Sequence, residues 1–346
     1  MKFKLLGKSG LRVSELFLGT MTFGEDWGWG CSKDVAKQVF NKYSDSGGNF
    51  IDTADNYANG TSEKFVGEFI QGDRDRFVIA TKYTLHNVKA KADPNQGGNH
   101  RKNLIRSVNG SLERLKTDYI DLLYLHMWDF TTPLEEVMNS LNNLISSGKV
   151  HYIGISDTPA WIVTRTNTLA EQRGWNPFVA FQFPYNIGRR DPEREIMPMC
   201  RELDIAMTIW APLAAGLLTG KYSSKEEVSG RLSEKFWGKP SEQAIKIAQK
   251  VDIIAKEIGC NSSQVALNWV RQQKGICIPI FSVTKLHQFE ENISCLDYTL
   301  SDDHMQRLNE IAEFEIGFPM GFLNSKSVLD LIHGETYPLV LNHRLK

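Results

Sequence analysis

The chain has 346 residues, of which 41% are hydrophobic and 23% charged, so it can bury a large core. Its formal net charge of -1 and pI near 6.7 give no charge excess suited to nucleic acid or an anionic membrane surface. No apolar run of about 18 or more residues occurs, and the five cysteines, without a C-x-x-C pair, favour a reduced, cytoplasmic protein that has no metal site.

The N-terminal third begins with two short apolar pieces within residues 2–13, which predict a hairpin ahead of the first core strand. Residues 15–20 predict that strand. The glycine-rich segment that follows, MTFGEDWGWGC, carries Trp27 and Trp29, an unusual choice for a solvated loop. We therefore expect these two side chains to contact something apolar.

Strands and helices then alternate along most of the chain, which is typical of a parallel barrel. About eight such units predict a single domain over residues 1–346, a (β/α)8 TIM barrel with the hairpin capping its floor. The predicted strands are 15–20, 50–54, 77–82, 120–126, 150–156, 178–183, 206–213 and 276–282. The predicted helices are 32–46, 61–71, 100–116, 133–147, 159–173, 193–203 and 262–274.

Three longer segments interrupt this alternation and predict functional loops, because long loops in compact domains usually carry function. They are residues 84–99, residues 222–240, long enough to fold over a cofactor, and the tail from Phe314. In the tail, the sequence GFPMGFL indicates a C-terminal substrate loop. Aromatic side chains of such loops either line a substrate pocket or pack on one another. The candidates are Trp27, Trp29, Trp128 and Phe318.

Four ionisable side chains lie where three predicted strands end. FIDTADNY carries Asp52 and Tyr57, FVIATK ends at Lys82, and IDLLYLH ends at His126. The carboxyl ends of parallel strands meet on one face of a barrel, so we expect these four side chains to lie together. Singly, Asp52 could be a turn cap, Lys82 a Schiff-base lysine and His126 a core histidine.

Together the four residues suit the reduction of a carbonyl group. A phenol, with a pKa of about 10, is a weak acid, and an adjacent ammonium such as that of Lys82 lowers its pKa. Asp52 would hold the lysine ionised, and His126 would orient the substrate oxygen while a hydride arrives at carbon. The protein would then donate only the proton, from Tyr57.

Several motifs in chain order resemble the aldo-keto reductase family: FIDTADNY, ATK, LYLH, GIS and WAPLAAGLLTGKY. The segments GGNHRKN, GISDTPAW and LTGKY are similar to its aryl-alcohol-dehydrogenase-like branch. The resemblance covers nearly the whole chain. It implies an NADP(H)-dependent oxidoreductase, with NAD(H) as the alternative cofactor, that reduces aldehydes or ketones, aromatic ones among them. It also implies that Asp52, Tyr57, Lys82 and His126 form the catalytic tetrad, with Tyr57 as general acid.

The sequence has no G-x-G-x-x-G or Walker pattern, so a dinucleotide must be held by other means. The resemblance implies that Ser156 and Gln182 fix the nicotinamide carboxamide and that Trp210 stacks on the ring. Asp157 stands where the family most often has Asn, and an ionised carboxylate accepts hydrogen bonds but cannot donate them. The implied pyrophosphate loop comprises Ala211, Pro212, Leu213, Gly216, Leu218 and Lys221. The implied cofactor contacts also include Thr20, Met21 and Asp52.

The segment SVTKLHQFEEN places a strand end against a helix start, where a ribose 2'-phosphate could be read. Its candidate donors are Ser282, Lys285, Gln288 and Asn292. Family members often have glycine in place of Ser282 and arginine in place of Thr284. Without an arginine fork, we expect a modest preference for NADP(H), carried chiefly by Lys285.

Two other functions fit the same residues. One is a redox-sensing or regulatory subunit that binds the cofactor with little turnover. The other is a Schiff-base lyase that uses Lys82. All three functions require a small-molecule ligand and no nucleic-acid or membrane partner.

Overall fold

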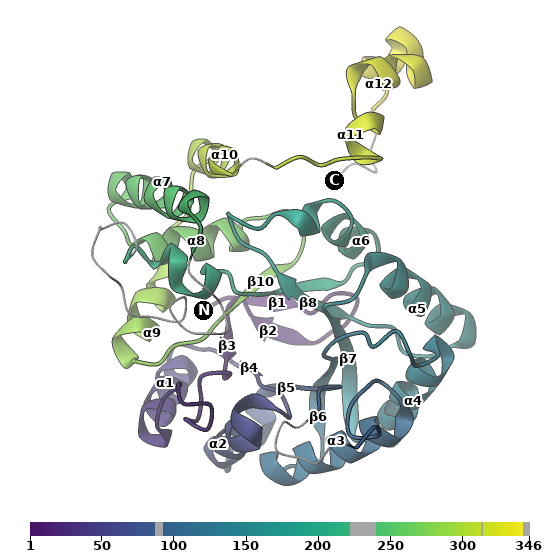
Figure 1. Cartoon of the computed structure of the whole chain (residues 1–346), viewed down its shortest axis with the longest axis vertical. Coiled ribbons are helices and arrows are strands. Elements are labelled where there is room, and N and C mark those ends of the chain that lie inside the picture. The colour runs from purple at the N-terminus through teal and green to yellow at the C-terminus, as the bar shows by residue number, and fades with distance from the viewer. Residues whose placement is uncertain (87–92, 222–239, 313, 342–346) are drawn as a thin grey trace.

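The computed structural model describes residues 1–86, 93–221, 240–312 and 314–341. Eight parallel strands form a closed barrel in the order β10-β3-β4-β5-β6-β7-β8-β9, with helices around the outside (Figure 1). The predicted (β/α)8 TIM barrel is therefore confirmed. The strands are β3 (Phe17–Gly19), β4 (Phe50–Asp52), β5 (Val78–Tyr83), β6 (Ile120–Leu125), β7 (Val150–Ser156), β8 (Ala180–Pro184), β9 (Ala206–Trp210) and β10 (Cys277–Phe281).

Most of the helices that cover the barrel bury one apolar stripe. In α3, for example, Leu104, Val108 and Leu115 are buried at helical spacing. By contrast, α8 is buried on all sides from Ser262 to Val270. Among the described residues, no helix is long and apolar enough to cross a membrane. The helices of the barrel are α1 (Lys33–Asp45), α2 (Thr61–Phe69), α3 (Arg101–Leu115), α4 (Leu134–Ser146), α5 (Ala160–Arg173), α6 (Ile196–Glu202), α7 (Glu242–Ile258), α8 (Ser262–Arg271), α9 (Leu286–Ile293) and α10 (Asp302–Ile311).

The N-terminal hairpin closes the floor of the barrel, as predicted. Strands β1 (Phe3–Leu5) and β2 (Arg12–Ser14) pair antiparallel. Leu6 and Val13 are fully buried in the same apolar cluster as the interior of the barrel. The backbone N–H of Lys8 donates to the carbonyl of Asp204, just before β9, at 2.7 Å. The hairpin thus covers the amino-terminal ends of the strands and leaves their carboxyl ends open.

Two predicted boundaries were wrong for local reasons. The strand predicted over 206–213 ends at Trp210, because Ala211 has a φ of 51°, which lies in the left-handed region and cannot continue a strand. The helix predicted over 193–203 begins at Ile196. Before it, Asp191–Glu193 forms a separate 3-10 turn with proline in its first turn.

Of the three interrupting segments, part of the first packs on the rim of the barrel, and the start of the third contacts the barrel through Phe314, whose ring lies 5.0 Å from the guanidinium groups of Arg190 and Arg194. In the first segment, the N–H of Asn99 donates to the carboxylate of Asp129 at 2.7 Å, and Thr84 donates to the side chain of Asn99 at 3.0 Å. The second segment, residues 222–239, lies outside the described residues, and so does the expectation that it folds over a cofactor.

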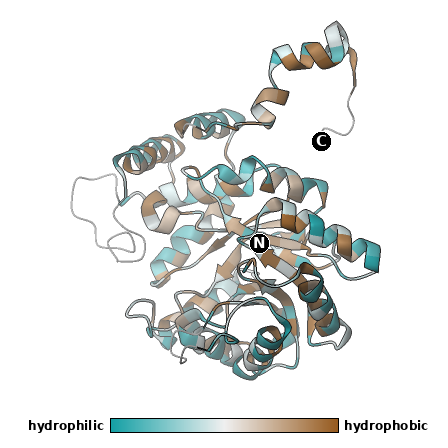
Figure 2. Ribbon diagram, turned by 45° about the vertical axis from the view of Figure 1, so that its right-hand side comes forward, coloured by the Kyte–Doolittle hydropathy of each residue, from teal (hydrophilic) through white to brown (hydrophobic). Residues whose placement is uncertain are grey.

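The C-terminal tail stands away from the barrel beyond α10 and forms the short helices α11 (Met320–Leu323) and α12 (Lys326–His333) (Figure 1). Most of its large apolar side chains are exposed, although Val328 is buried, and the tail shows hydrophobic colouring outside the barrel (Figure 2). Phe318 is 86% exposed, and its ring lies 6.3 Å from that of Phe322. The structure does not bring Phe318 to the tetrad, because the chain leads outward after Glu315 (Figure 1), so its place in a substrate pocket stays a prediction.

Candidate active site

The four predicted catalytic side chains meet at the carboxyl ends of three adjacent strands. Asp52 ends β4, Lys82 lies near the end of β5, and His126 directly follows β6. Tyr57 lies on the turn after β4, where Ala58 and Asn59 both adopt left-handed backbone conformations and lead the chain back into α2. This turn places the phenol of Tyr57 over the strand ends.

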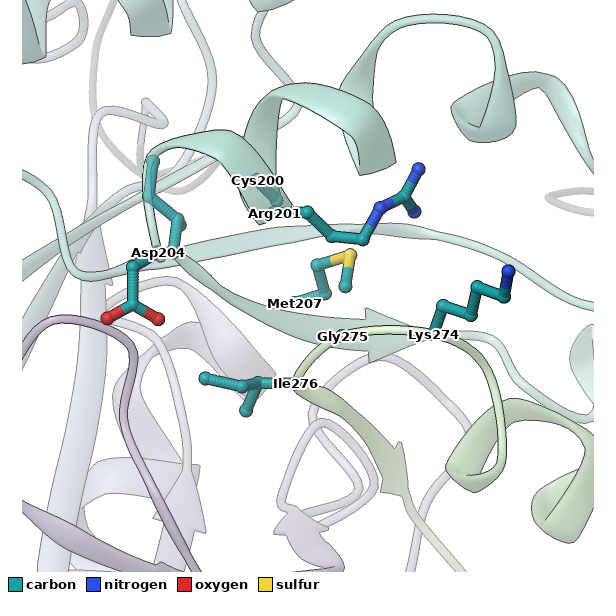
Figure 3. A pocket seen from close by; sticks show the side chains of 8 residues that line it. Cys200, Arg201, Asp204, Met207, Lys274, Gly275 and Ile276 are labelled. Atoms are coloured by element: carbon teal, nitrogen blue, oxygen red, sulfur yellow. The ribbon is translucent and has the colours of Figure 1, made fainter. Parts of the chain in front are cut away.

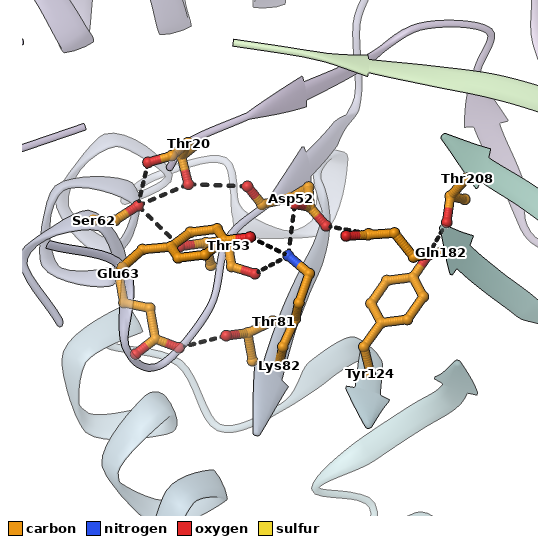
Figure 4. A network of polar contacts seen from close by, with 11 residues as sticks. Thr20, Asp52, Thr53, Ser62, Glu63, Thr81, Lys82, Tyr124, Gln182 and Thr208 are labelled. Carbon is orange, nitrogen blue, oxygen red and sulfur yellow. Dashed lines mark hydrogen bonds and ion pairs between the residues drawn. The ribbon is translucent and has the colours of Figure 1, made fainter. Parts of the chain in front are cut away.

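Lys82 is the centre of the cluster, and its side chain is fully buried. Its Nζ lies 2.7 Å from Oδ2 of Asp52, 2.8 Å from the carbonyl oxygen of Thr53 and 3.1 Å from the phenol oxygen of Tyr57 (Figure 4). An ammonium has three protons, so each one has an acceptor. The contribution of Thr53 escaped sequence analysis, because a backbone carbonyl leaves no mark in a sequence.

Charge and burial shift the pKa values of Lys82 and Tyr57 in opposite directions. Burial alone would favour a neutral amine, but the carboxylate of Asp52 and the oxygen of Tyr57 raise the pKa of Lys82. For Tyr57, burial raises the pKa, and the ammonium of Lys82 only partly opposes this shift. Lys82 lowers the pKa of Tyr57, as expected, but burial raises that pKa by more. Tyr57 is therefore protonated at neutral pH, the form that a proton donor needs.

His126 is 8% exposed, and its ring centre lies 6.0 Å from that of Tyr57 in an edge-on arrangement. Burial first, and then the nearby ammonium of Lys82, lower the pKa of His126 well below 6.5. The imidazole is therefore neutral and offers one N–H donor and one acceptor. Its Nδ1 is buried and has no hydrogen-bond partner among the residues that the structure describes.

Asp52 is held from two further sides. The amide of Gln182 donates to its Oδ1 at 2.8 Å, and the hydroxyl of Thr20 donates to its backbone carbonyl at 3.0 Å (Figure 4). The hydroxyl of Ser62 contacts those of Thr20 and Thr53, at 2.7 and 3.0 Å. Gln182 and Thr20 were predicted to contact a cofactor, and the structure shows them supporting Asp52. Ser62 was missed, because a lone serine at a helix start reads as a cap.

At the end of β7, Ser156 is buried and Asp157 turns the chain with a φ of 42°. Oδ1 of Asp157 accepts a hydrogen bond of 3.1 Å from the indole Nε1 of Trp210. Burial raises the pKa of Asp157 to about 6, although the Trp210 hydrogen bond and the charge of Lys82 oppose the shift. The two predicted nicotinamide neighbours Asp157 and Trp210 are thus in direct contact.

The loop after Trp210 turns through several left-handed residues. Ala211, Ala214, Ala215 and Gly216 all have positive φ values, and the N–H groups of Ala214 and Gly216 donate to the carbonyls of Ala211 and Leu213 within the loop. A Cβ added at Gly216 would lie 3.3 Å from Nζ of Lys221, so the ammonium packs closely against this glycine. Lys221 thus brings a positive charge to the loop, which suits the diphosphate of a dinucleotide. Pro212, Leu213 and Leu218 form the remainder of the loop, with Leu218 buried beneath it.

At the end of β10, the hydroxyl of Ser282 lies 2.7 Å from that of Thr22. The side-chain oxygen of Gln288 accepts from the N–H of Thr284 at 3.0 Å, while Asn292 is buried. Lys285 precedes α9 and is exposed. Of the four predicted 2'-phosphate donors, Lys285 is therefore the one that presents a charge at the surface.

The aromatic candidates divide into two groups. The ring of Trp27 lies 6.3 Å from that of Tyr57, edge-on, and 5.5 Å from that of Trp29. Trp128 is partly buried and packs against the larger apolar core. Trp27 thus borders the tetrad and packs on Trp29, while Met21 is half-buried at the start of their loop.

A hollow of about 350 Å³ lies at the other end of the barrel, between the end of α6 and the starts of β9 and β10 (Figure 3). Arg201 and Lys274 border it, and both are exposed. It is remote from the tetrad, so we do not connect it with the chemistry. In the described parts of the chain, no cluster of three His, Cys, Asp or Glu side chains could hold a metal ion.

A parallel barrel that gathers ionisable side chains at the carboxyl ends of its strands defines the class of (β/α)8 barrel enzymes. Residues 15–313 match the model of the aldo/keto reductase family. The chain belongs to this family, which confirms the predicted resemblance and makes the protein an oxidoreductase with a small-molecule substrate.

Three relatives illustrate the similarity. A norsolorinic acid reductase of Aspergillus flavus is 39% identical over 327 residues, covering 92% of this chain and 83% of the relative. The aryl-alcohol dehydrogenase [NADP(+)] of Phanerodontia chrysosporium is 37% identical over 342 residues, covering 94% and 89%. An aryl-alcohol dehydrogenase of Pestalotiopsis microspora is 38% identical over 333 residues, covering 93% and 85%.

Proposed function

We propose that the protein is an NADP(H)-dependent oxidoreductase that reduces aldehydes and ketones to alcohols, with Tyr57 as the general acid. The observation that carries this proposal is the phenol of Tyr57, 3.1 Å from a buried ammonium that Asp52 holds in place. A bound reduced nicotinamide supplies the hydride. The chain's own residues bind and orient the carbonyl and deliver the proton.

The carbonyl oxygen binds between the phenol of Tyr57 and the imidazole of His126, and a neutral imidazole can donate a hydrogen bond to it. As the hydride reaches carbon, negative charge develops on oxygen and Tyr57 transfers its proton there. The ammonium of Lys82 stabilises the resulting phenolate, and Asp52 keeps Lys82 charged and fixed. Alcohol oxidation uses the same groups in reverse, with the phenolate as base.

Three observations support an aromatic substrate and NADP(H). Trp27 borders the tetrad and packs on Trp29, and the apolar faces of this pair suit an aromatic ring. The names of two relatives describe aryl-alcohol dehydrogenases, one of them specifying NADP(+). Lys285 provides an exposed cation at the candidate 2'-phosphate position, and NAD(H) remains the alternative cofactor.

Five free cysteines support the cytoplasmic setting that we propose.

The Schiff-base alternative is less well supported, because that chemistry needs a neutral amine whereas the surroundings of Lys82 raise its pKa. No structural feature specifically favours the regulatory alternative. Purified protein should be assayed with NADPH and with NADH against aromatic and aliphatic aldehydes and ketones, following nicotinamide absorbance. Borohydride trapping should be run in parallel. Consumption of NADPH with alcohol formation supports the proposal, and an adduct on Lys82 without NADPH consumption would refute it.

A further inference from the structure

Asp157 introduces a negative charge beside the catalytic cluster. Its backbone N–H donates to the carbonyl of Gln182 at 3.1 Å, and its Oδ1 accepts from the indole of Trp210. It thereby connects the ends of β7, β8 and β9. The charge acts on the tetrad, since Lys82 lowers the pKa of Asp157 while Asp157 raises that of Tyr57.

The chemistry requires a nicotinamide ring close to this carboxylate. Hydride transfer needs the donor carbon about 3–3.5 Å from the acceptor carbon. That acceptor carbon is bonded to the oxygen that Tyr57 protonates, so the ring must lie beside the tetrad. The two forms of the ring differ in charge, since the oxidised ring carries one positive charge and the reduced ring carries none.

We propose that the carboxylate of Asp157 makes the protein bind the oxidised, cationic nicotinamide in preference to the reduced form. This inference rests on the proposed function, because it requires a nicotinamide cofactor. It gives Asp157 a positioning and electrostatic role on the cofactor and no contact with the reacting atoms. Stabilising the oxidised ring shifts the equilibrium on the protein toward hydride donation by the reduced form, and so toward carbonyl reduction, the direction in which Tyr57 acts as acid.

The other charged and titratable groups around Asp157 do not remove the effect. Lys82 and Arg189 are the cations that act on it, Tyr57 is protonated and His126 is neutral. All of them are present with either form of the cofactor. Burial leaves Asp157 with a pKa of about 6, so the carboxylate is charged above that pH and neutral below it. The preference should therefore weaken as the pH falls.

The substitution Asp157→Asn removes the charge of this side chain while keeping its orientation. The amide oxygen of asparagine can accept the same indole hydrogen bond, but the side chain is neutral. Dissociation constants of NADP+ and NADPH should be measured by quenching of tryptophan fluorescence at about pH 5.5 and pH 8. The ratio of the two constants is the readout, because the 2'-phosphate, whose pKa is about 6, is common to both and cancels.

We expect the parent at pH 8 to favour NADP+ about tenfold more strongly than Asp157→Asn does. At pH 5.5 the ratio of the two dissociation constants for the parent should approach the ratio for the variant. The variant's ratio should not change with pH. Asp45→Asn, which removes an exposed carboxylate at the end of α1, serves as the matched control and should retain the parent's ratio.

If both forms bind and Asp157→Asn leaves the ratio within twofold of the parent at pH 8, the inference is wrong while the proposed function stands. If the ratio of the two dissociation constants for the parent does not change with pH, the inference is likewise wrong while the proposed function stands. If neither NADP+ nor NADPH quenches the fluorescence at millimolar concentration, the proposed function itself fails, and the inference fails with it.

Discussion

The ammonium of Lys82 lies 3.1 Å from the phenol oxygen of Tyr57; the side chain of Lys82 is fully buried and Tyr57 is half-buried. Burial of the lysine reduces the screening of its charge by water at this contact. The pair also shares Asp52 as a common anchor. These two residues should therefore behave as one functional unit in kinetics.

That coupling can be tested with Lys82→Met. We expect reduction by this variant to fall by about two to four orders of magnitude, nearly as far as in Tyr57→Phe, because the phenolate loses its stabilising cation. The double variant should be no slower than either single variant, since residues that act as a unit are not additive. Single-turnover rates measure this directly, and multiplicative losses would show that Lys82 acts independently of the phenol.

Asp55, which lies between Asp52 and Tyr57 in the chain, should limit stability at high pH. Burial, and then the charge of Glu63, raise its pKa to about 7, and its Oδ1 has no hydrogen-bond partner among the described residues. A folded-state pKa above the unfolded value stabilises the fold at low pH, and the contribution is lost as the pH rises toward 7.

Asp55→Asn should accordingly stabilise the protein, by about 2 kcal/mol more at pH 8 than at pH 4.5. Urea unfolding of parent and variant at both pH values measures the difference. Asp45→Asn, an exposed carboxylate, provides the control and should show no such pH-dependent gain. An equal effect of Asp55→Asn at the two pH values would mean that the carboxyl group titrates normally in the folded protein.

Lys285 should set a modest preference for NADPH over NADH. It is exposed and is the one cation among the proposed 2'-phosphate donors, and an exposed ion pair contributes only about 1 kcal/mol and is screened by salt. Lys285→Ala should therefore reduce the NADPH preference about fivefold at low ionic strength and less at high ionic strength. Dissociation constants from fluorescence titration test this. Tighter binding of NADH by the parent would contradict it.

Trp27 and Phe318 should differ in their effect on substrate binding, although both were predicted for the pocket. Trp27 lies edge-on to Tyr57, whereas Phe318 is on the exposed tail. Trp27→Ala should raise KM for an aromatic aldehyde about fivefold or more through the loss of aromatic contact. Phe318→Ala should leave KM within twofold. A larger effect at Phe318 would show that the tail reaches the site during turnover.

The meeting of Asp52, Lys82 and His126 was predictable because each ends an apolar run, and parallel strands bring such ends together; Tyr57 follows from its place five residues after Asp52 on the same connecting loop. The supporting contacts were less accessible to sequence analysis. The carbonyl of Thr53 and the hydroxyl of Ser62 depend on backbone positions that no residue pattern encodes. The Asp157–Trp210 contact joins two strands 53 residues apart, so it too became visible only in three dimensions.

The prediction of the helices was less complete. Helix α7 has Ile247, Val251 and Ile254 buried at regular spacing, so the sequence carries a helical pattern there. The helix was not predicted, because it directly follows the polar segment 222–240, which was interpreted as a loop. The tail shows the opposite problem. GFPMGFL predicted a substrate loop, but composition alone does not say what such a segment contacts, and Phe318 and Phe322 lie exposed beyond α10.

The central claim is that Tyr57 protonates a carbonyl while NADPH delivers hydride to its carbon. The most direct measurement uses NADPH deuterated on the transferable position, an aromatic aldehyde, and parent or Tyr57→Phe protein, with mass analysis of the product alcohol. The account predicts deuterium on the carbinol carbon with the parent. With Tyr57→Phe, it predicts an alcohol yield lower by about two to four orders of magnitude at nearly unchanged NADPH affinity. Alcohol formed without deuterium, or near-normal turnover by Tyr57→Phe, would contradict it.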